Sequence, residues 1–139
     1  MPPHNRMIPH SMCKILHYLF ALGALYAGLA VATQALATHL PDAAFFPPQG
    51  RSMVQKAADI ALWHGIALCA LTLGVTRLHP LRLTIGCLGL ALGTTFFSIP
   101  VALHGFGYLL LARLAPLGGS MIILSWLCVA SSALGQKKP

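Results

Sequence analysis

Acidic residues are nearly absent from this sequence: it contains two aspartates and no glutamate, against nine lysines and arginines. Charged residues of both signs make up 8% of its 139 residues, whereas soluble domains usually carry about 25%. So few charges cannot cover a surface of this size that faces water. The shortage therefore excludes an ordinary soluble domain, and the 57% content of hydrophobic residues points to lipid as the surroundings.

The same shortage limits the chemistry that the chain can perform. Paired-carboxylate hydrolysis needs two neighbouring acids, but Asp42 stands beside Pro41 in a predicted loop while Asp59 lies in an apolar segment. The sequence has no glycine-rich phosphate loop and no Gly-x-Ser-x-Gly motif. We therefore expect a protein that is not an enzyme and that uses no cofactor.

Cysteine is also scarce, and its spacing forms no ligand motif. No CxxC pair occurs, and three of the four cysteines lie in apolar segments, where a free thiol behaves as a small hydrophobic group. We favour this interpretation over a metal or redox role. The four are Cys13, Cys69, Cys87 and Cys128.

Positive charge is present, with a net charge of +7, but it lies at the edges of the apolar segments. A nucleic-acid-binding protein gathers lysine and arginine on one face, whereas membrane proteins place them where long side chains reach the headgroups. We therefore expect a lipid bilayer as partner and no nucleic acid. The basic residues are Arg6, Lys14, Arg51, Lys56, Arg77, Arg82, Arg113, Lys137 and Lys138.

Four apolar segments, at about 15–38, 53–75, 83–104 and 116–134, are long enough to cross a bilayer. The first contains no charge and, at about 1.5 Å per residue, extends about 36 Å, more than the hydrocarbon thickness of about 30 Å. The sequence thus predicts an all-α membrane domain of four transmembrane helices over 15–134. Short cytoplasmic tails, 1–14 and 135–139, flank it.

The first segment has a rival interpretation as a cleavable signal peptide. A basic start, an apolar core and the Ala-x-Ala motif at 35–37 are typical of such peptides. Their cores usually run about 7–15 residues, however, and this segment is longer and contains Tyr18 and Gln34. We therefore expect a retained transmembrane helix.

The distribution of basic residues predicts the orientation of the helices. The two tails and the second loop hold six of them, whereas the first and third loops hold three. The positive-inside rule places the richer side in the cytoplasm. Both termini are therefore expected there.

Local motifs predict details of the second and third helices. Ser52 and Gln55 have capping-box spacing at the start of the second helix. Lys56 and Asp59 lie three residues apart and are expected to form an ion pair on one helix face. Pro100 is expected to kink the third helix near one end.

Small residues recur in the first and third helices. The GxxxG pair at 89–93 and the GxxxA pairs at 23–27 and 28–32 have the spacing at which membrane helices pack closely. The alternative is that glycine is simply frequent in membrane helices. We predict helix packing at Gly23, Gly28, Gly86, Gly89 and Gly93.

Polar residues gather in one half of the predicted bundle. An acid such as Asp59 is costly in a membrane helix and is normally paired. It could meet histidines in a proton or metal site, or the same residues could have structural hydrogen bonds, which is the interpretation that we favour. No two histidines have i, i+4 spacing, and we assign no catalytic or metal-binding residue. The candidate cluster comprises His39, Asp59, His64, Ser98 and His104.

Four short motifs occur in a recognisable order: ATHL at 37–40, WHGIAL at 63–68, FS at 97–98 and PLGG at 116–119, followed by Trp126. Over roughly 15–134 this order resembles the YgdD/YwdK-like family of small bacterial inner-membrane proteins with the domain of unknown function DUF423. Where that family tends to have Gly-Ala-Phe-Gly-Ala-His, this sequence has QALATH at 34–39 and lacks both glycines. The resemblance implies four membrane helices and an inner-membrane location, and no reaction.

Three functional hypotheses follow. The leading one is a non-enzymatic membrane protein that acts through helix–helix association, either as a homo-oligomer or with a membrane-protein partner. The alternative is a small transporter subunit that handles protons or metal ions through the candidate cluster; because four helices are few for a transport path, it would need to dimerise. A third is a haem or copper electron carrier that uses His64 and a second histidine.

Overall fold

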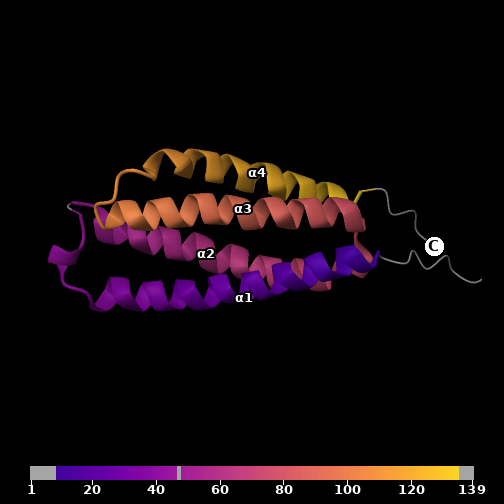
Figure 1. The fold of residues 1–139 in the computed structure, drawn as a ribbon, viewed down its shortest axis with the longest axis horizontal. Coiled ribbons are helices and arrows are strands. Elements are labelled where there is room, and N and C mark those ends of the chain that lie inside the picture. The colour runs from indigo at the N-terminus through magenta and orange to yellow at the C-terminus, as the bar shows by residue number, and fades with distance from the viewer. Residues whose placement is uncertain (1–8, 47, 135–139) are drawn as a thin grey trace, which may run out of the picture.

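The chain folds into four long helices joined by short connections (Figure 1). The computed structural model describes residues 9–46 and 48–134. Each of the four helices is long and apolar enough to cross a membrane, α4 together with the short turn before it, so the predicted all-α membrane fold is confirmed. The helices are α1 (His10–His39), α2 (Gly50–Leu73), α3 (Pro80–Gly105) and α4 (Ala115–Ser132), and the 3-10 turns are η1 (Asp42–Ala44), η2 (Val75–Arg77) and η3 (Ala112–Leu114).

All four helices begin earlier than the sequence predicts, α3 at Pro80 and α4 at Ala115 among them. α1 starts at His10, so residues 10–14 are helical, while 1–8 and 135–139 of the predicted tails lie outside the described residues. The capping box at Ser52 is wrong, because Gly50 N already donates to the Phe46 carbonyl at 2.8 Å and α2 begins at Gly50. The Ser52 hydroxyl instead donates to the Gln49 carbonyl at 2.9 Å.

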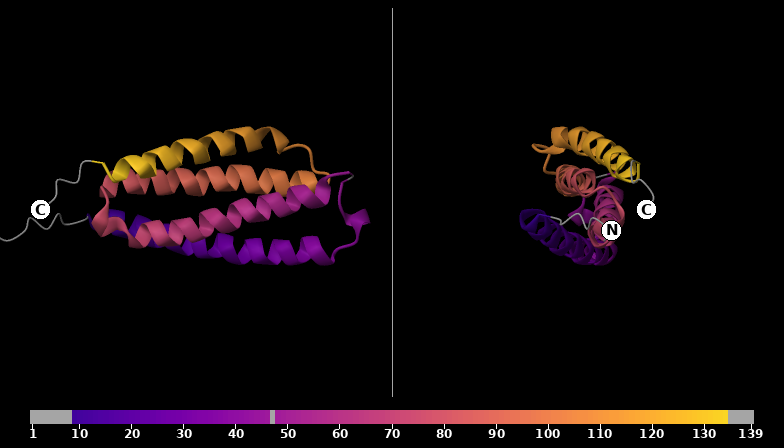
Figure 2. Two further views of the ribbon diagram at one scale, coloured as in Figure 1. Left: turned by 180° about the vertical axis from the view of Figure 1, so that it is seen from behind. Right: turned by 90° about the vertical axis from the view of Figure 1, so that its right-hand side faces the viewer.

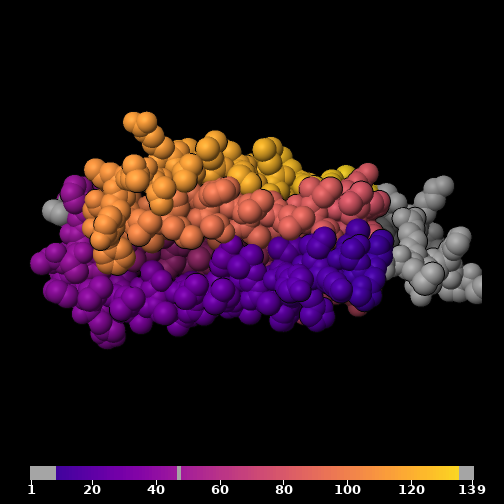
Figure 3. Space-filling model, viewed as in Figure 1, coloured from indigo at the N-terminus to yellow at the C-terminus, as the bar shows by residue number. Residues whose placement is uncertain are grey.

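The four helices form a zigzag row in which each packs mainly on its neighbours in the sequence (Figure 2). α1 and α4 form opposite edges of the row (Figure 3), and α1 touches α3 only slightly. The start of α1, the end of α4 and the α2–α3 connection lie at one end, which we call the terminal end (Figure 1). The other end carries the α1–α2 and α3–α4 connections and is called the two-loop end. The edge helices thus leave broad surfaces uncovered.

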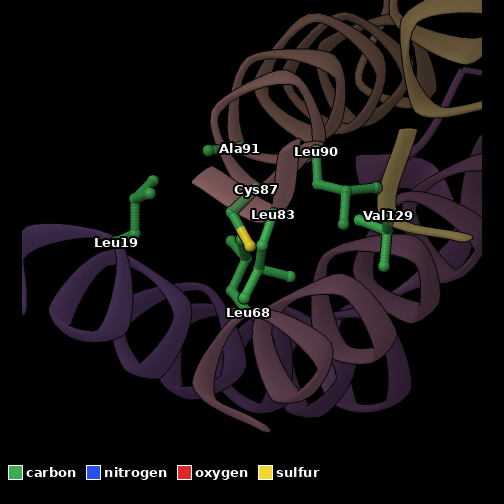
Figure 4. Packing of buried hydrophobic residues seen from close by; sticks show 7 residues of the cluster. All are labelled: Leu19, Leu68, Leu83, Cys87, Leu90, Ala91 and Val129. Carbon is green, nitrogen blue, oxygen red and sulfur yellow. The ribbon is translucent and has the colours of Figure 1, made fainter. Parts of the chain in front are cut away.

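The larger of two buried clusters lies in the terminal half, where all four helices contribute side chains (Figure 4). Outward-facing side chains are as apolar as those inside, and Leu25, Ile85 and Leu124 are each more than half exposed. A water-facing surface would be mostly polar at such positions, so this surface suits lipid. The core cluster comprises Leu19, Leu68, Leu83, Cys87, Leu90, Ala91 and Val129.

Reciprocal glycine contacts set the distance between α1 and α2 and between α2 and α3. A Cβ atom built on Gly23 would lie 2.7 Å from the Gly65 carbonyl oxygen, and one built on Gly65 would lie 2.6 Å from that of Gly23. Gly50 and Gly105 repeat the arrangement near the two-loop end, where a Cβ on Gly105 would lie 2.5 Å from the Gly50 oxygen. Only glycine permits backbones to approach so closely.

Of the other glycines predicted to pack, three meet α4. A Cβ on Gly93 would lie 3.0 Å from the Gly118 carbonyl oxygen, and Gly86 and Gly89 face Val129 and Ser125. The small residues of α1 and α3 therefore do not pack on each other, because each set faces the neighbouring helix in the sequence. Gly28 differs from all of these: a Cβ built there meets no described heavy atom within 4 Å.

The α1–α2 connection is held by Arg51. Its guanidinium donates to the carbonyl of Leu40 at 2.7 Å and to that of Ala37, and forms an ion pair with Asp42 at 2.7 Å. It also covers the Phe45 ring at 4.6 Å from the centroid. Because the last carbonyls of a helix have no partner within it, Arg51 caps α1, whereas the sequence predicts only that it marks a helix end.

Candidate functional site

The five residues of the candidate cluster have different surroundings in the structure. His39 is exposed in the last turn of α1, and His104 is half-buried in the last turn of α3. Asp59 and His64 bond to different partners, and Ser98 lines a cavity. Among the described residues, no group of three or more His, Cys, Asp or Glu side chains is placed to hold a metal ion. A metal site of three such ligands, one of the possibilities considered from the sequence, is therefore not assembled among these residues.

Asp59 is paired across the α1–α2 interface with an amide. Gln34 Nε2 donates to Asp59 Oδ1 at 2.5 Å. The expected ion pair between Lys56 and Asp59 does not form. Lys56 is exposed and lies closer to the end of the helix, where a basic side chain can reach headgroups. Asp59 lies about 14 Å into α2 at about 1.5 Å per residue, and it is exposed. A carboxylate at this depth faces lipid, which makes it costly unless it is partnered.

His64 links α2 to α4. Trp126 Nε1 donates to His64 Nε2 at 3.2 Å, and His64 Nδ1 lies 2.7 Å from the Ile60 carbonyl oxygen. Because an indole nitrogen only donates, Nε2 accepts and Nδ1 carries the hydrogen that Ile60 accepts. Both ring nitrogens of this buried imidazole are thereby engaged. This geometry leaves no nitrogen of His64 free for a haem or copper, contrary to the electron-carrier hypothesis.

A cavity of about 240 Å³ lies between α1, α2 and α3, from the middle of the bundle toward the two-loop end. Its wall on α2 is made of three alanines, Ala57, Ala58 and Ala61, whose small side chains leave the space open. In the space-filling view, atoms of α2 are visible in the gap between α1 and α3 on this side (Figure 3). The cavity therefore opens sideways, toward the surroundings of the bundle.

Hydroxyl-bearing residues line the α3 side of this cavity, and the hydroxyls of two of them are buried without a partner among the described residues. The Tyr26 hydroxyl donates to the Ala91 carbonyl at 2.9 Å and lies 2.5 Å from Thr95 Oγ1, which ties α1 to α3. By contrast, Thr94 Oγ1 and Ser98 Oγ are buried with no hydrogen-bond partner among the described residues. Serine and threonine in helices often bond to the carbonyl four residues earlier, but these two hydroxyls do not.

Sequence reasoning identified Ser98 and the cost of Asp59 but did not identify the cavity. The signal was available in α2, where the alanines at 57, 58 and 61 fall on one helix face opposite hydroxyl-bearing positions of α3. Gln34 lies 25 positions from its partner Asp59 in the sequence, and Trp126 lies 62 positions from its partner His64. No local spacing rule connects residues so far apart.

The DUF423 family model, described as a protein of unknown function, matches residues 30–119. The match covers the last third of α1, all of α2 and α3, and the beginning of α4, and so includes every residue that lines the cavity from α2 and α3. The resemblance noted in the sequence is thereby confirmed. No curated protein and no solved structure matches the chain significantly.

Proposed function

This chain belongs to the DUF423 family, and from that premise we propose that it is a non-enzymatic protein of the bacterial inner membrane that acts by association with a second copy. The association is through the outward face of α1. Four helices long and apolar enough to cross a membrane support a multi-pass protein. The excess of basic residues in the tails and second loop supports the cytoplasmic placement of both termini.

The observation that carries the proposal is the uncovered small-residue face of α1. No described atom lies within 4 Å of a Cβ built on Gly28, and Ala24, Ala32 and Ala35 on the same side of the helix are exposed. In lipid, helices associate where small residues let backbones approach, because apolar burial alone gives no preference over lipid tails. α1 forms an edge of the row (Figure 3), so a second α1 can reach this face.

The Gln34–Asp59 pair, where α1 meets α2, gives a separate, polar reason for a further helix to pack on the bundle. Asp59 is exposed and accepts one hydrogen bond from Gln34, although a carboxylate can accept several. Lipid tails supply no donors, so a further helix that covers the pair lowers its cost.

Site-specific photocrosslinking in native membranes tests the proposal. A photoreactive amino acid replaces Val31, which is 60% exposed and lies one turn after Gly28, or Leu124 of α4, which is 66% exposed and serves as the matched control. We expect a crosslinked dimer from position 31, little from position 124, and loss of the dimer when Gly28→Leu is added. Equal crosslinking at both positions, or monomer alone at both, would contradict the proposal.

A further inference from the structure

Two basic side chains at the terminal end have no acidic side chain of this chain near them. The sequence contains only two acids: Asp42 lies in η1 at the two-loop end, where it pairs with Arg51, and Asp59 lies about 14 Å along α2 from that end. Lys14 of α1 and Arg77 of η2 are both exposed at the terminal end. An acidic counter-charge for them must therefore come from the surroundings of the bundle.

A third cation at this end, Arg82, is already engaged. Its guanidinium donates to the Ser131 carbonyl at 3.0 Å and to the Leu134 carbonyl at 3.3 Å, and so covers the end of α4. Within residues 9–46 and 48–134, no ion pair involves Lys14 or Arg77. These two side chains are thus available to an external anion.

The length of α1 places Lys14 at the level of the lipid headgroups. The helix has 30 residues and extends about 45 Å at about 1.5 Å per residue, whereas the hydrocarbon core is about 30 Å thick. Roughly five residues at each end therefore lie outside the hydrocarbon. Lys14 is the fifth residue of the helix, and His17 lies one turn deeper.

A hollow of about 190 Å³ lies between the beginning of α1 and the end of α2. The Thr72 hydroxyl in its wall is bonded to the Leu68 carbonyl at 2.8 Å, so His17 supplies the available polar group. Phe20 and Leu73 are 40% and 73% exposed, so the hollow faces the lipid. Its lining residues are Leu16, His17, Phe20, Thr72 and Leu73.

The two cations lie about one turn beyond this hollow. α1 and α2 are antiparallel, and their contacts advance together toward the terminal end (Figure 1). Cys69 Sγ donates to the Phe20 carbonyl at 3.5 Å, and His17 shares the hollow with Leu73. One further turn along α1 brings Lys14 to the level of η2, the 3-10 turn that follows α2 and ends in the second cation.

We propose that the hollow and these cations bind an anionic phospholipid. Its phosphate lies between Lys14 and Arg77, and one acyl chain lies in the hollow against Phe20 and Leu73. His17 stands between the two, where the N–H of its ring can donate to a phosphate or ester oxygen. Basic side chains at a membrane surface attract anionic lipids, and the adjoining hollow makes this attraction a site for one molecule. The site requires the membrane fold and not a second copy.

Native mass spectrometry of the full-length protein released from lipid nanodiscs tests the site. The nanodiscs contain equal amounts of dioleoylphosphatidylglycerol, which is anionic, and dioleoylphosphatidylcholine, which has the same acyl chains and no net charge. We expect one phosphatidylglycerol to be retained per chain, in preference to phosphatidylcholine by at least about tenfold. Glycerol 1-phosphate, an anion without acyl chains, should not displace it even in large excess.

Matched variants assign the binding to the two cations. Lys14→Gln and Arg77→Gln should each lower the preference for phosphatidylglycerol by about fivefold, and the double variant should abolish it. Exchange of the two residue types, Lys14→Arg with Arg77→Lys, should retain it. The control is Lys56→Gln with Arg113→Gln, which removes two exposed cations toward the two-loop end and should bind as the wild type does.

The Tm in phosphatidylcholine alone keeps the test interpretable. Lys14→Gln/Arg77→Gln should have the wild-type Tm there, because both side chains are exposed, and phosphatidylglycerol should raise the Tm of the wild type more than that of this variant. The proposal is overturned by equal retention of the two lipids, by displacement with glycerol 1-phosphate, or by equal losses in the two charge-removing double variants. A lower Tm of Lys14→Gln/Arg77→Gln in phosphatidylcholine would also contradict it, since the two cations would then serve the fold.

Discussion

Replacing Gly65 with alanine places a methyl group between two helix backbones. The new Cβ would lie 2.6 Å from the Gly23 carbonyl oxygen, whereas ordinary contact begins at 3.4 Å. The opposing atom is backbone, so no side-chain rotation can relieve the contact, and α1 and α2 must separate by up to the difference of 0.8 Å. Gly23 and Gly65 lie at the middle of the α1–α2 interface, so this shift disturbs packing on both sides.

The expected cost follows from two opposing effects. Overpacking a tight interface costs about 1–3 kcal/mol, while alanine in place of glycine favours the helix by about 1 kcal/mol. We therefore expect Gly65→Ala to lower the free energy of unfolding by up to about 2 kcal/mol. Gly28→Ala is the matched control: it makes the same replacement in a helix interior with no described atom within 4 Å, and should be neutral or stabilising by up to about 1 kcal/mol.

Reversible unfolding by dodecyl sulfate in mixed micelles, followed by circular dichroism at concentrations where the protein is monomeric, measures both variants. The double variant Gly23→Ala/Gly65→Ala should lose less than the two single losses combined, because both methyl groups disturb one contact. If Gly65→Ala unfolds at the same dodecyl sulfate fraction as Gly28→Ala, the glycine contact does not set the helix distance. The described packing of α1 on α2 would then be refuted.

Three further predictions concern the His64–Trp126 bond, the contacts of Arg51 and the membrane topology. A double-mutant cycle with His64→Ala and Trp126→Phe should give a coupling free energy of about 0.6–2 kcal/mol in the same unfolding assay; additive losses would show that the two rings do not bond. Arg51→Lys should destabilise the protein by about 1 kcal/mol, because lysine cannot bond two carbonyls and a carboxylate together, whereas Arg113→Lys at an exposed position should change it by less than about 0.5 kcal/mol. An alkaline phosphatase fusion after Gly50 should be active, and a silent fusion at normal expression would reverse the proposed topology.

The sequence predicts the four helices well, because length and hydropathy alone determine which segments can cross a bilayer. It is less informative about their ends: α1 begins at His10 and α2 at Gly50, where backbone hydrogen bonds rather than the Ser52 side chain start the helix. Helix ends are decided by local backbone geometry that composition does not record.

Pairings between helices are the least predictable part of the candidate site. Glycine spacing indicates that a face can pack closely, but not which helix it will meet, and so Gly28 remains uncovered while Gly93 meets α4. Residue spacing likewise does not indicate which polar residues meet across helices: Asp59 bonds to Gln34 of α1. His64 bonds to Trp126 of α4. Which residues meet across helices depends on which helices pack side by side, and the spacing within one helix does not indicate that.

Native mass spectrometry of the protein released from lipid nanodiscs tests the central claim, association through α1, most directly. The wild type should appear at twice the 14.7 kDa of one chain, and Gly28→Leu should appear at the mass of a single chain. A wild-type protein that is released only as a monomer, or a Gly28→Leu variant that remains a dimer, would contradict association through this face.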